Sequence, residues 1–376
     1  MEKSQSFSAA FSLYLDFFRL AAALTVVAAH AVMPMFSGAH YAFPFGEDAV
    51  TAFFVLSGLV IAYVANTKET NAQAFMSARL AKLWSVLIPA LLIGPLLVGI
   101  GNLVWPVGSG ALNWSMTSGE IPRSILAAFF SNELWFVSMT PNLNVPLWSI
   151  GFEFWYYTLF AIFIFAPRKV RWLGIGAVLL IMGPQMWLLM PCWIMGAAIY
   201  LLRDRFQFSR TVAVAIFVLA PIAILVGHGL HAARFLQDLY LPVLGAGFVF
   251  DEIFFARDFI WQNVMGALVA AHLAGAMVLF RKAVIVEWVK KPIQVVSGVT
   301  YSVYLLHFPA MLMIGSMLHA WEMETMKVAV MFAGSLAISA GFGYFLEPLK
   351  FPLRDLLRRF LRAFLKKRAE IVATAI

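Results

Sequence analysis

The stretch YLDFFRLAAALTVVAAHAVM, residues 14–33, holds an arginine, Arg19, and a histidine, His30, inside a largely apolar run. Such a run is long enough to cross a membrane, which takes about 20 residues. A helix turns by about 100° per residue, so the two side chains share one face about 16 Å apart along the axis. An arginine at membrane depth costs at least about 2.5–3.5 kcal/mol unless it faces a polar cavity or a partner. Asp16 is one such partner, but two polar groups on one face favour a lined pathway.

The composition is that of an integral membrane protein. Of the 376 residues, 62% are hydrophobic and 12% are charged, whereas a soluble domain is nearer half apolar and a quarter charged. The mean hydropathy is +0.86. The single cysteine, Cys192, excludes an intrachain disulfide and a cysteine-based metal site. The histidines show no metal-ligand spacing that a carboxylate completes, so we expect no metal.

Apolar segments recur along the chain and predict an all-α, polytopic membrane helix bundle with about ten transmembrane helices. The expected spans are 11–33, 48–66, 82–102, 146–165, 171–187, 189–202, 211–227, 260–280, 295–318 and 326–346.

Basic residues lie mainly on one side of these spans, which predicts the orientation. With the amino terminus in the cytoplasm, the cytoplasmic segments carry most of the lysines and arginines, and both termini are cytoplasmic. The opposite side then carries Arg123, Arg234, Arg257 and Lys327. Two long segments on that outer side, about 103–145 and 228–259, are expected to cover a cavity.

The carboxyl-terminal stretch FPLRDLLRRFLRAFLKKR, residues 351–368, alternates apolar and basic side chains at helical spacing. Such a helix is expected to lie on anionic membrane lipids. We therefore divide the chain into a membrane domain, 1–350, and a basic amphipathic cytoplasmic tail, 351–376.

Further polar side chains fall inside or beside the apolar spans. Glu153 and His307 each lie within a span, and a buried carboxylate must find a hydrogen-bond donor or a proton. Arg79 and Lys82 lie at the cytoplasmic mouth of the third span. They are suited either to bind a phosphorylated substrate or only to follow the charge rule for topology.

The order of these motifs resembles the acyltransferase-3 family of integral membrane acyltransferases over nearly the whole chain. The matching elements are Leu15-Asp16 with Arg19 and His30, FFVLSG at 53–58, SARLAKLW at 77–84, LWSIGFEFWYY at 147–157, YSVYLLHFP at 301–309 and LEPLKFPLR at 346–354. Two positions depart from the family pattern. Thr51 stands where many members carry an acid, with Glu47 and Asp48 nearby, and Ser85 replaces a common proline.

The resemblance implies transfer of an acyl group, most often acetyl, from cytoplasmic acyl-CoA to a hydroxyl of an extracytoplasmic carbohydrate or glycolipid. It implies His30, Arg19 and Glu153 as catalytic residues, with His30 either the general base for the acceptor hydroxyl or a transient carrier of the acyl group. Arg79, Lys82, Trp148, Tyr301 and His307 are the expected substrate-binding residues. Acyl-CoA is then a donor substrate rather than a bound cofactor. Membrane lipids are the other expected partners, and no nucleic acid is expected to bind. The expected location is the bacterial inner membrane.

Two other functions are compatible with these residues. Intramembrane Arg, Glu and His side chains also mark the proton relays of coupled transporters, although no internal repeat of the kind common in transporters is visible. A non-catalytic scaffold leaves the cost of burying Arg19 and Glu153 unexplained.

Overall fold

A computed structural model describes residues 6–38, 43–69, 71–113, 117–205, 209–285 and 287–374, with side chains up to Ala363. Within these ranges the regular structure is entirely helical, which confirms the all-α prediction. The longer helices are α1 (Ala9–Ala31), α3 (Gly46–Thr67), α4 (Ala72–Val104), α7 (Trp148–Phe165), α8 (Arg168–Met182), α9 (Pro184–Leu201), α10 (Arg210–Gly229), α11 (Ala232–Leu244), α12 (Phe259–Leu279), α13 (Glu287–Ser297), α14 (Thr300–Met317), α15 (Glu324–Leu346) and α16 (Lys350–Thr374). The short ones are α2 (Pro34–Ser37), α5 (Pro106–Leu112), α6 (Glu120–Ala128), η1 (Asn142–Leu147), η2 (Arg203–Arg205), η3 (Phe248–Glu252), η4 (Phe254–Ala256), η5 (Phe280–Lys282) and η6 (Glu347–Leu349).

Polar residues begin three of the long helices. Ser8, Asn71 and Ser209 precede α1, α4 and α10, and the side-chain oxygen of each accepts a hydrogen bond from a backbone N–H of the first turn. These caps satisfy donors that have no partner within the helix. Helices α1 and α10 therefore begin close to their predicted spans, at 9 against 11 and at 210 against 211, whereas α4 begins at 72, well before the predicted start at 82.

Eight helical segments of the described chain are long and apolar enough to cross a membrane. A ninth is the pair α13 and α14, which bends by 47°. Nine of the ten expected spans correspond to these segments. The structure is therefore that of a multi-pass membrane protein.

The remaining span, α8, has 15 residues and measures about 22 Å, less than the roughly 30 Å of a bilayer core. The indole of Trp148, at the start of α7, stacks on Phe255 at 4.6 Å between ring centroids. The N–H of Phe255 donates to Oε1 of Gln185, at the start of α9, at 3.0 Å. Since α7 and α9 begin at the same end of the bundle, α8 must return the chain across it. Each of the ten expected spans thus corresponds to a helical segment of the described chain, but only eight or nine of these segments are long and apolar enough to cross a membrane.

The break between α8 and α9 lies at Gly183, earlier than the sequence predicts. Gly183 has a φ of +87°, and a Cβ there would lie 2.4 Å from Cα of Trp135. Pro184 follows as the first residue of α9. Only glycine fits both the backbone angle and the close approach, so the turn is fixed at this position.

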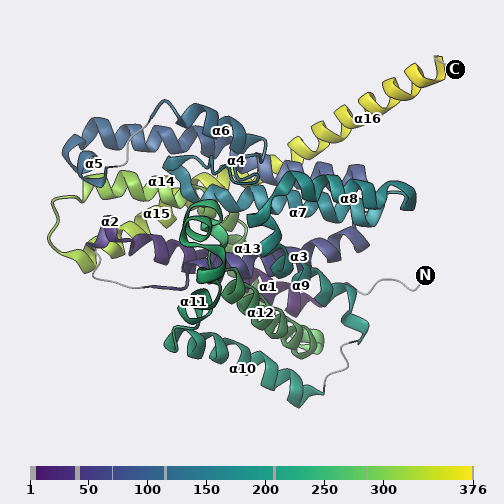
Figure 1. Ribbon diagram of the computed structural model, residues 1–376, viewed down its shortest axis with the longest axis horizontal. Helices are drawn as coiled ribbons and strands as arrows, with labels where there is room; N and C mark the ends of the chain where they lie inside the picture. Colours follow the sequence, from purple (N-terminus) through teal and green to yellow (C-terminus); the bar gives the residue numbers. More distant parts are fainter. Residues whose placement is uncertain are drawn as a thin grey trace.

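The centre of the bundle is built around α3, α9 and α14 (Figure 1). A Cβ on Gly58 of α3 would lie 2.0 Å from the carbonyl oxygen of Trp193 of α9, and one on Gly196 would lie 1.8 Å from that of Val55. The two backbones touch because these residues have no side chain. In α14, 15 of 18 residues are buried. This rigid core holds the polar side chains described next.

The basic carboxyl-terminal segment forms α16, which projects from the bundle (Figure 1). Its base contacts the start of α4, where Nε2 of Gln73 donates to the Arg358 carbonyl at 3.3 Å. Nε of Arg358 donates to Oγ of Ser77 at 3.4 Å. The division into two domains and the contact of α16 with lipid stay predictions.

Candidate active site

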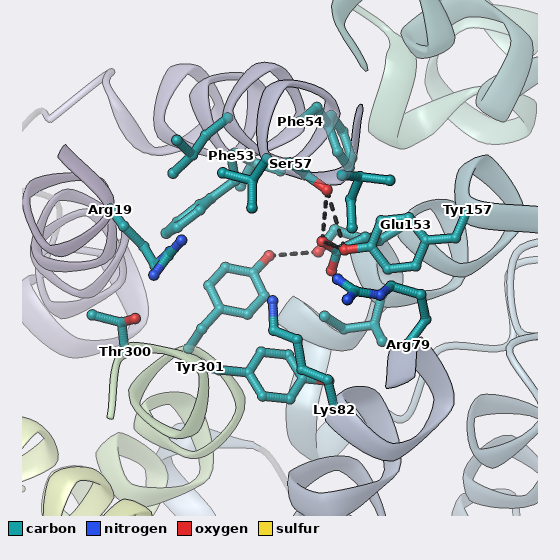
Figure 2. Close-up of a pocket in the computed structure, with 17 residues that line it drawn as sticks. Arg19, Phe53, Phe54, Ser57, Arg79, Lys82, Glu153, Tyr157, Thr300 and Tyr301 are labelled. Atoms are coloured by element: carbon teal, nitrogen blue, oxygen red, sulfur yellow. Dashed lines mark hydrogen bonds between the residues drawn. The ribbon is translucent and has the colours of Figure 1, made fainter. Parts of the chain in front are cut away.

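Five helices of the bundle enclose a polar cavity with about 750 Å³ of empty space, part of it open to solvent. Its walls come from α1, α3, α4, α7 and α14 (Figure 2). Five residues singled out from the sequence line it: Arg19, Arg79, Lys82, Glu153 and Tyr301. Helices that are distant in sequence therefore bring three basic side chains and one acid into a single space.

Glu153 is held by two hydroxyl groups that sequence reasoning missed. Its Oε1 accepts hydrogen bonds from Oγ of Ser57, at 2.9 Å, and from the hydroxyl of Tyr157. Nε1 of Trp193 in turn donates to Oγ of Ser57 at 3.3 Å. Tyr157 lies one helical turn after Glu153, a spacing visible in the sequence. The donors that a buried carboxylate requires are thus supplied by α3 and α7.

Arg79 is already paired. Its Nη2 lies 2.7 Å from Oε1 of Glu69, and the two side chains are 10% and 11% exposed. The guanidinium also lies 5.5 Å from the ring centre of Phe75. Nε of Arg79 is buried and has no hydrogen-bond partner in the part of the chain that the structure describes. The ion pair with Glu69 was not expected from the sequence.

Lys82 differs from Arg79 in having no ion-pair or hydrogen-bond partner for its ammonium group among the described residues. Its Nζ points into the cavity (Figure 2) and lies 5.8 Å from the ring centre of Tyr301. The hydroxyl of Tyr301 donates to the carbonyl of Leu83 at 3.1 Å, so the tyrosine presents its ring. Lys82 is the cation best placed to meet an anionic ligand.

Arg19 both pairs with Asp16 and faces the cavity, the two possibilities that the sequence left open. Its Nη1 lies 3.2 Å from Oδ1 of Asp16, and both side chains are partly exposed. The same guanidinium faces the cavity from the α1 side (Figure 2). The pairing with Asp16 therefore coexists with a position on the cavity wall.

His30 and His307 contact each other just outside this wall. Nε2 of His307 lies 3.1 Å from Nδ1 of His30. Tyr304 connects the pair to the cavity: it lines the cavity, and its ring centre lies 6.2 Å from that of His307. Arg19 and His30 thus lie on successive parts of one helix, as expected, with Tyr304 between the cavity and the histidines.

The remaining expected residues have packing or distant partners. Trp148 is not a cavity-lining residue; its indole is buried and stacks on Phe255. Asp48 binds His228 and accepts from Nε1 of Trp261 at 3.2 Å, and Glu47 pairs with Arg257. The neighbouring carboxylates are therefore engaged away from His30, whose ring has no acidic partner among the described residues.

Comparison with known proteins places the chain in a family. Residues 12–344 match the family model Acyl_transf_3, described as an acyltransferase domain. The chain belongs to this family.

As a member of the acyltransferase domain family, the chain is also similar to the acyltransferase MdmB of Streptomyces mycarofaciens. The two are 29% identical over 126 residues, which cover 33% of this chain and 30% of that protein. The match thus spans under a third of the relative's length. No solved structure matches the chain. Acyl transfer is the activity that these findings support.

Proposed function

We propose that this acyltransferase moves an acetyl group from cytoplasmic acetyl-CoA to a hydroxyl group of an extracytoplasmic carbohydrate, in the bacterial inner membrane. The observation that carries the proposal is the cavity itself, in which Arg19, Arg79 and Lys82 face a single carboxylate beside a histidine pair. A cavity with surplus positive charge suits a polyanionic donor, and histidine is a common general base.

In the proposed donor complex, Lys82 binds a phosphate oxygen of the coenzyme. Its ammonium has no ion-pair or hydrogen-bond partner among the described residues and faces the cavity, whereas Arg79 shares its charge with Glu69. Within the described residues, Nε of Arg79 is a donor without an acceptor. Arg19 lies on the opposite wall and meets the acyl end. The positive-inside rule puts the Lys82 side at the cytoplasm, where acyl-CoA is found.

The proposed chemistry takes place at Nε2 of His30. This nitrogen removes the proton of the acceptor hydroxyl while the hydroxyl oxygen bonds to the thioester carbonyl carbon. The carbon–sulfur bond then breaks, and the coenzyme thiolate leaves with the proton from the imidazolium. The products are an ester and free thiol, so no further reactant is needed.

Glu153 offsets one of the positive charges that line the cavity in this scheme. Its bonds to Ser57 and Tyr157 hold it in place, and no contact among the described residues joins it to His30. The ring of Tyr301 forms a wall for the donor. Trp148 supports the site from behind, through Phe54 and Phe255.

The test uses the full chain reconstituted in lipid vesicles with radiolabelled acetyl-CoA outside and a mixture of candidate sugars inside. We expect release of coenzyme thiol in step with acetyl incorporation. His30→Ala is expected to lower this rate by about two or more orders of magnitude while the protein inserts normally. A proton-coupled transporter would consume no acetyl-CoA, and an active His30→Ala variant would overturn the assigned base. Mass spectrometry of surface glycans from a deletion strain identifies the acceptor.

A further inference from the structure

The hydrogen bonds of the histidine pair determine where its protons lie. Nδ1 of His307 lies 2.9 Å from the carbonyl oxygen of Val303, and Nδ1 of His30 lies 3.0 Å from that of Val26. A carbonyl oxygen only accepts, so each Nδ1 must carry a proton. Since a neutral imidazole has one N–H, Nε2 of each ring then carries no proton and has a lone pair that can accept a hydrogen bond.

This assignment makes the contact between the rings directional. Nδ1–H of His30 faces Nε2 of His307 at 3.1 Å. If Nε2 of His307 also carried a proton, two donors would face each other. The bond therefore runs from His30 to His307, and the His30 proton is shared between His307 and Val26. Nε2 of His30 is left without a hydrogen-bond partner among the described residues.

We propose that His307 is the positioning residue of the reaction: it accepts the Nδ1 proton of His30 and leaves Nε2 of His30 as the basic atom. This role rests on the proposed function, and it differs from the substrate-binding role that the sequence predicts for His307. His307 is completely buried, whereas His30 is partly exposed. The buried ring of His307 is thus placed to orient His30, and the ring of His30 is placed to react with the acceptor.

A neutral imidazole here takes the place that a carboxylate occupies in many histidine-based sites. Thr51 is buried and lacks a carboxyl group, and Asp48 is committed to His228 and Trp261. His307 supplies the missing acceptor from α14, a helix that is almost wholly buried. The edge contact of Phe308 with His30, 5.5 Å between ring centres, further limits rotation of the catalytic ring.

Two variants of similar side-chain length separate positioning from packing. In His307→Gln, the side-chain amide oxygen can reach the position of Nε2 and accept from His30. In His307→Met, the volume is kept but no comparable acceptor remains. We expect His307→Met to lower kcat by roughly 10- to 100-fold, with KM for acetyl-CoA unchanged because His307 is outside the cavity. His307→Gln is expected to retain most of the activity.

Equal activities of the two variants would overturn the positioning role, as would a change in KM alone. A parallel His30→Ala measurement distinguishes this failure from failure of the proposed function. If His30→Ala is active, the assigned base is wrong; if it is inactive while His307→Met is fully active, only the role of His307 is wrong.

A spectroscopic measurement tests the proton positions without relying on activity. In protein with nitrogen-15-labelled histidine, the assigned signals of His30 should show a protonated Nδ1 and an unprotonated Nε2 at neutral pH. Free imidazole side chains favour the opposite tautomer, so the expected pattern is specific. A protonated Nε2 on neutral His30 would refute the arrangement whatever the kinetics show.

Discussion

The ion pair of Arg79 with Glu69 predicts a large loss of stability when the arginine alone is removed. The pair is short, at 2.7 Å, and about nine-tenths buried, so its two charges screen each other in place of water. Replacing Arg79 with methionine leaves the Glu69 carboxylate buried without its partner. Breaking a buried pair in this way costs about 3–5 kcal/mol.

The matched comparisons use neighbouring positions. Glu69→Gln combined with Arg79→Met removes both charges, so most of the lost stability should return. Lys82→Met lies about one turn further along the same helix and removes a cation with no ion-pair partner among the described residues. It should change stability by less than about 1 kcal/mol.

Thermal unfolding of the four proteins in one detergent, followed by tryptophan fluorescence without ligand, measures these differences. The expected order of unfolding temperature puts Arg79→Met clearly lowest. Similar temperatures for Arg79→Met and Lys82→Met, or no recovery in the double variant, would refute the structural role of the pair. Arg79 would then be better explained as a free donor-site cation.

Two further predictions concern the donor and the outer segment. Lys82→Met should weaken acetyl-CoA binding roughly 10- to 150-fold, which corresponds to about 1.5–3 kcal/mol for a charged hydrogen bond, whereas Lys82→Arg should keep most of the affinity. Calorimetry at two salt concentrations should also show that Lys82→Met loses part of the wild-type salt dependence. Equal affinities of wild type and Lys82→Met would contradict the role of Lys82. Glu133 lies outside the membrane spans, and burial raises the pKa of its carboxyl from 4.5 to about 7, although Thr140 and Ser138 donate to it. Because the folded state holds this proton up to about pH 7 and the unfolded state loses it near 4.5, stability should fall as pH rises through this window, by at most about 3 kcal/mol. Glu133→Gln should flatten that fall in unfolding temperature between pH 5 and 8, and identical slopes for variant and wild type would disprove the assignment.

The membrane spans could be predicted because an apolar run is a signal carried by consecutive residues. The same holds for Arg19 and Glu153, whose burial cost marks them wherever the neighbouring helices lie. Lys82 was indicated only by its place at the cytoplasmic mouth of a span and by the resemblance. Their gathering in one cavity followed from motif order and resemblance rather than from spacing. The boundary at Gly183 was misplaced because the reason for it, the close approach of Trp135, lies in another segment.

Contacts between residues on different helices could not be predicted from the sequence, because each partner lies in another segment of the chain. Glu69 lies ten positions before Arg79 on the other side of a turn, and nothing in its own neighbourhood indicates a partner. His30 and His307 are 277 positions apart and meet because α1 and α14 pack together. Ser57 was part of a recognised motif, but its bond to Glu153 depends on the contact of α3 with α7.

The short helix α8 has a consequence for the lipid around the protein. It is roughly 8 Å shorter than the apolar layer that it crosses. Its outer face carries exposed large side chains, among them Trp172, Leu173 and Leu180, which must stay in contact with acyl chains. We therefore expect the bilayer to thin beside α8, at a cost of fractions of a kcal/mol per Å. Because α8 packs against α7, the helix that carries Glu153, we expect the two aqueous phases to come nearest to each other beside one wall of the cavity, and thicker membranes to oppose this fit.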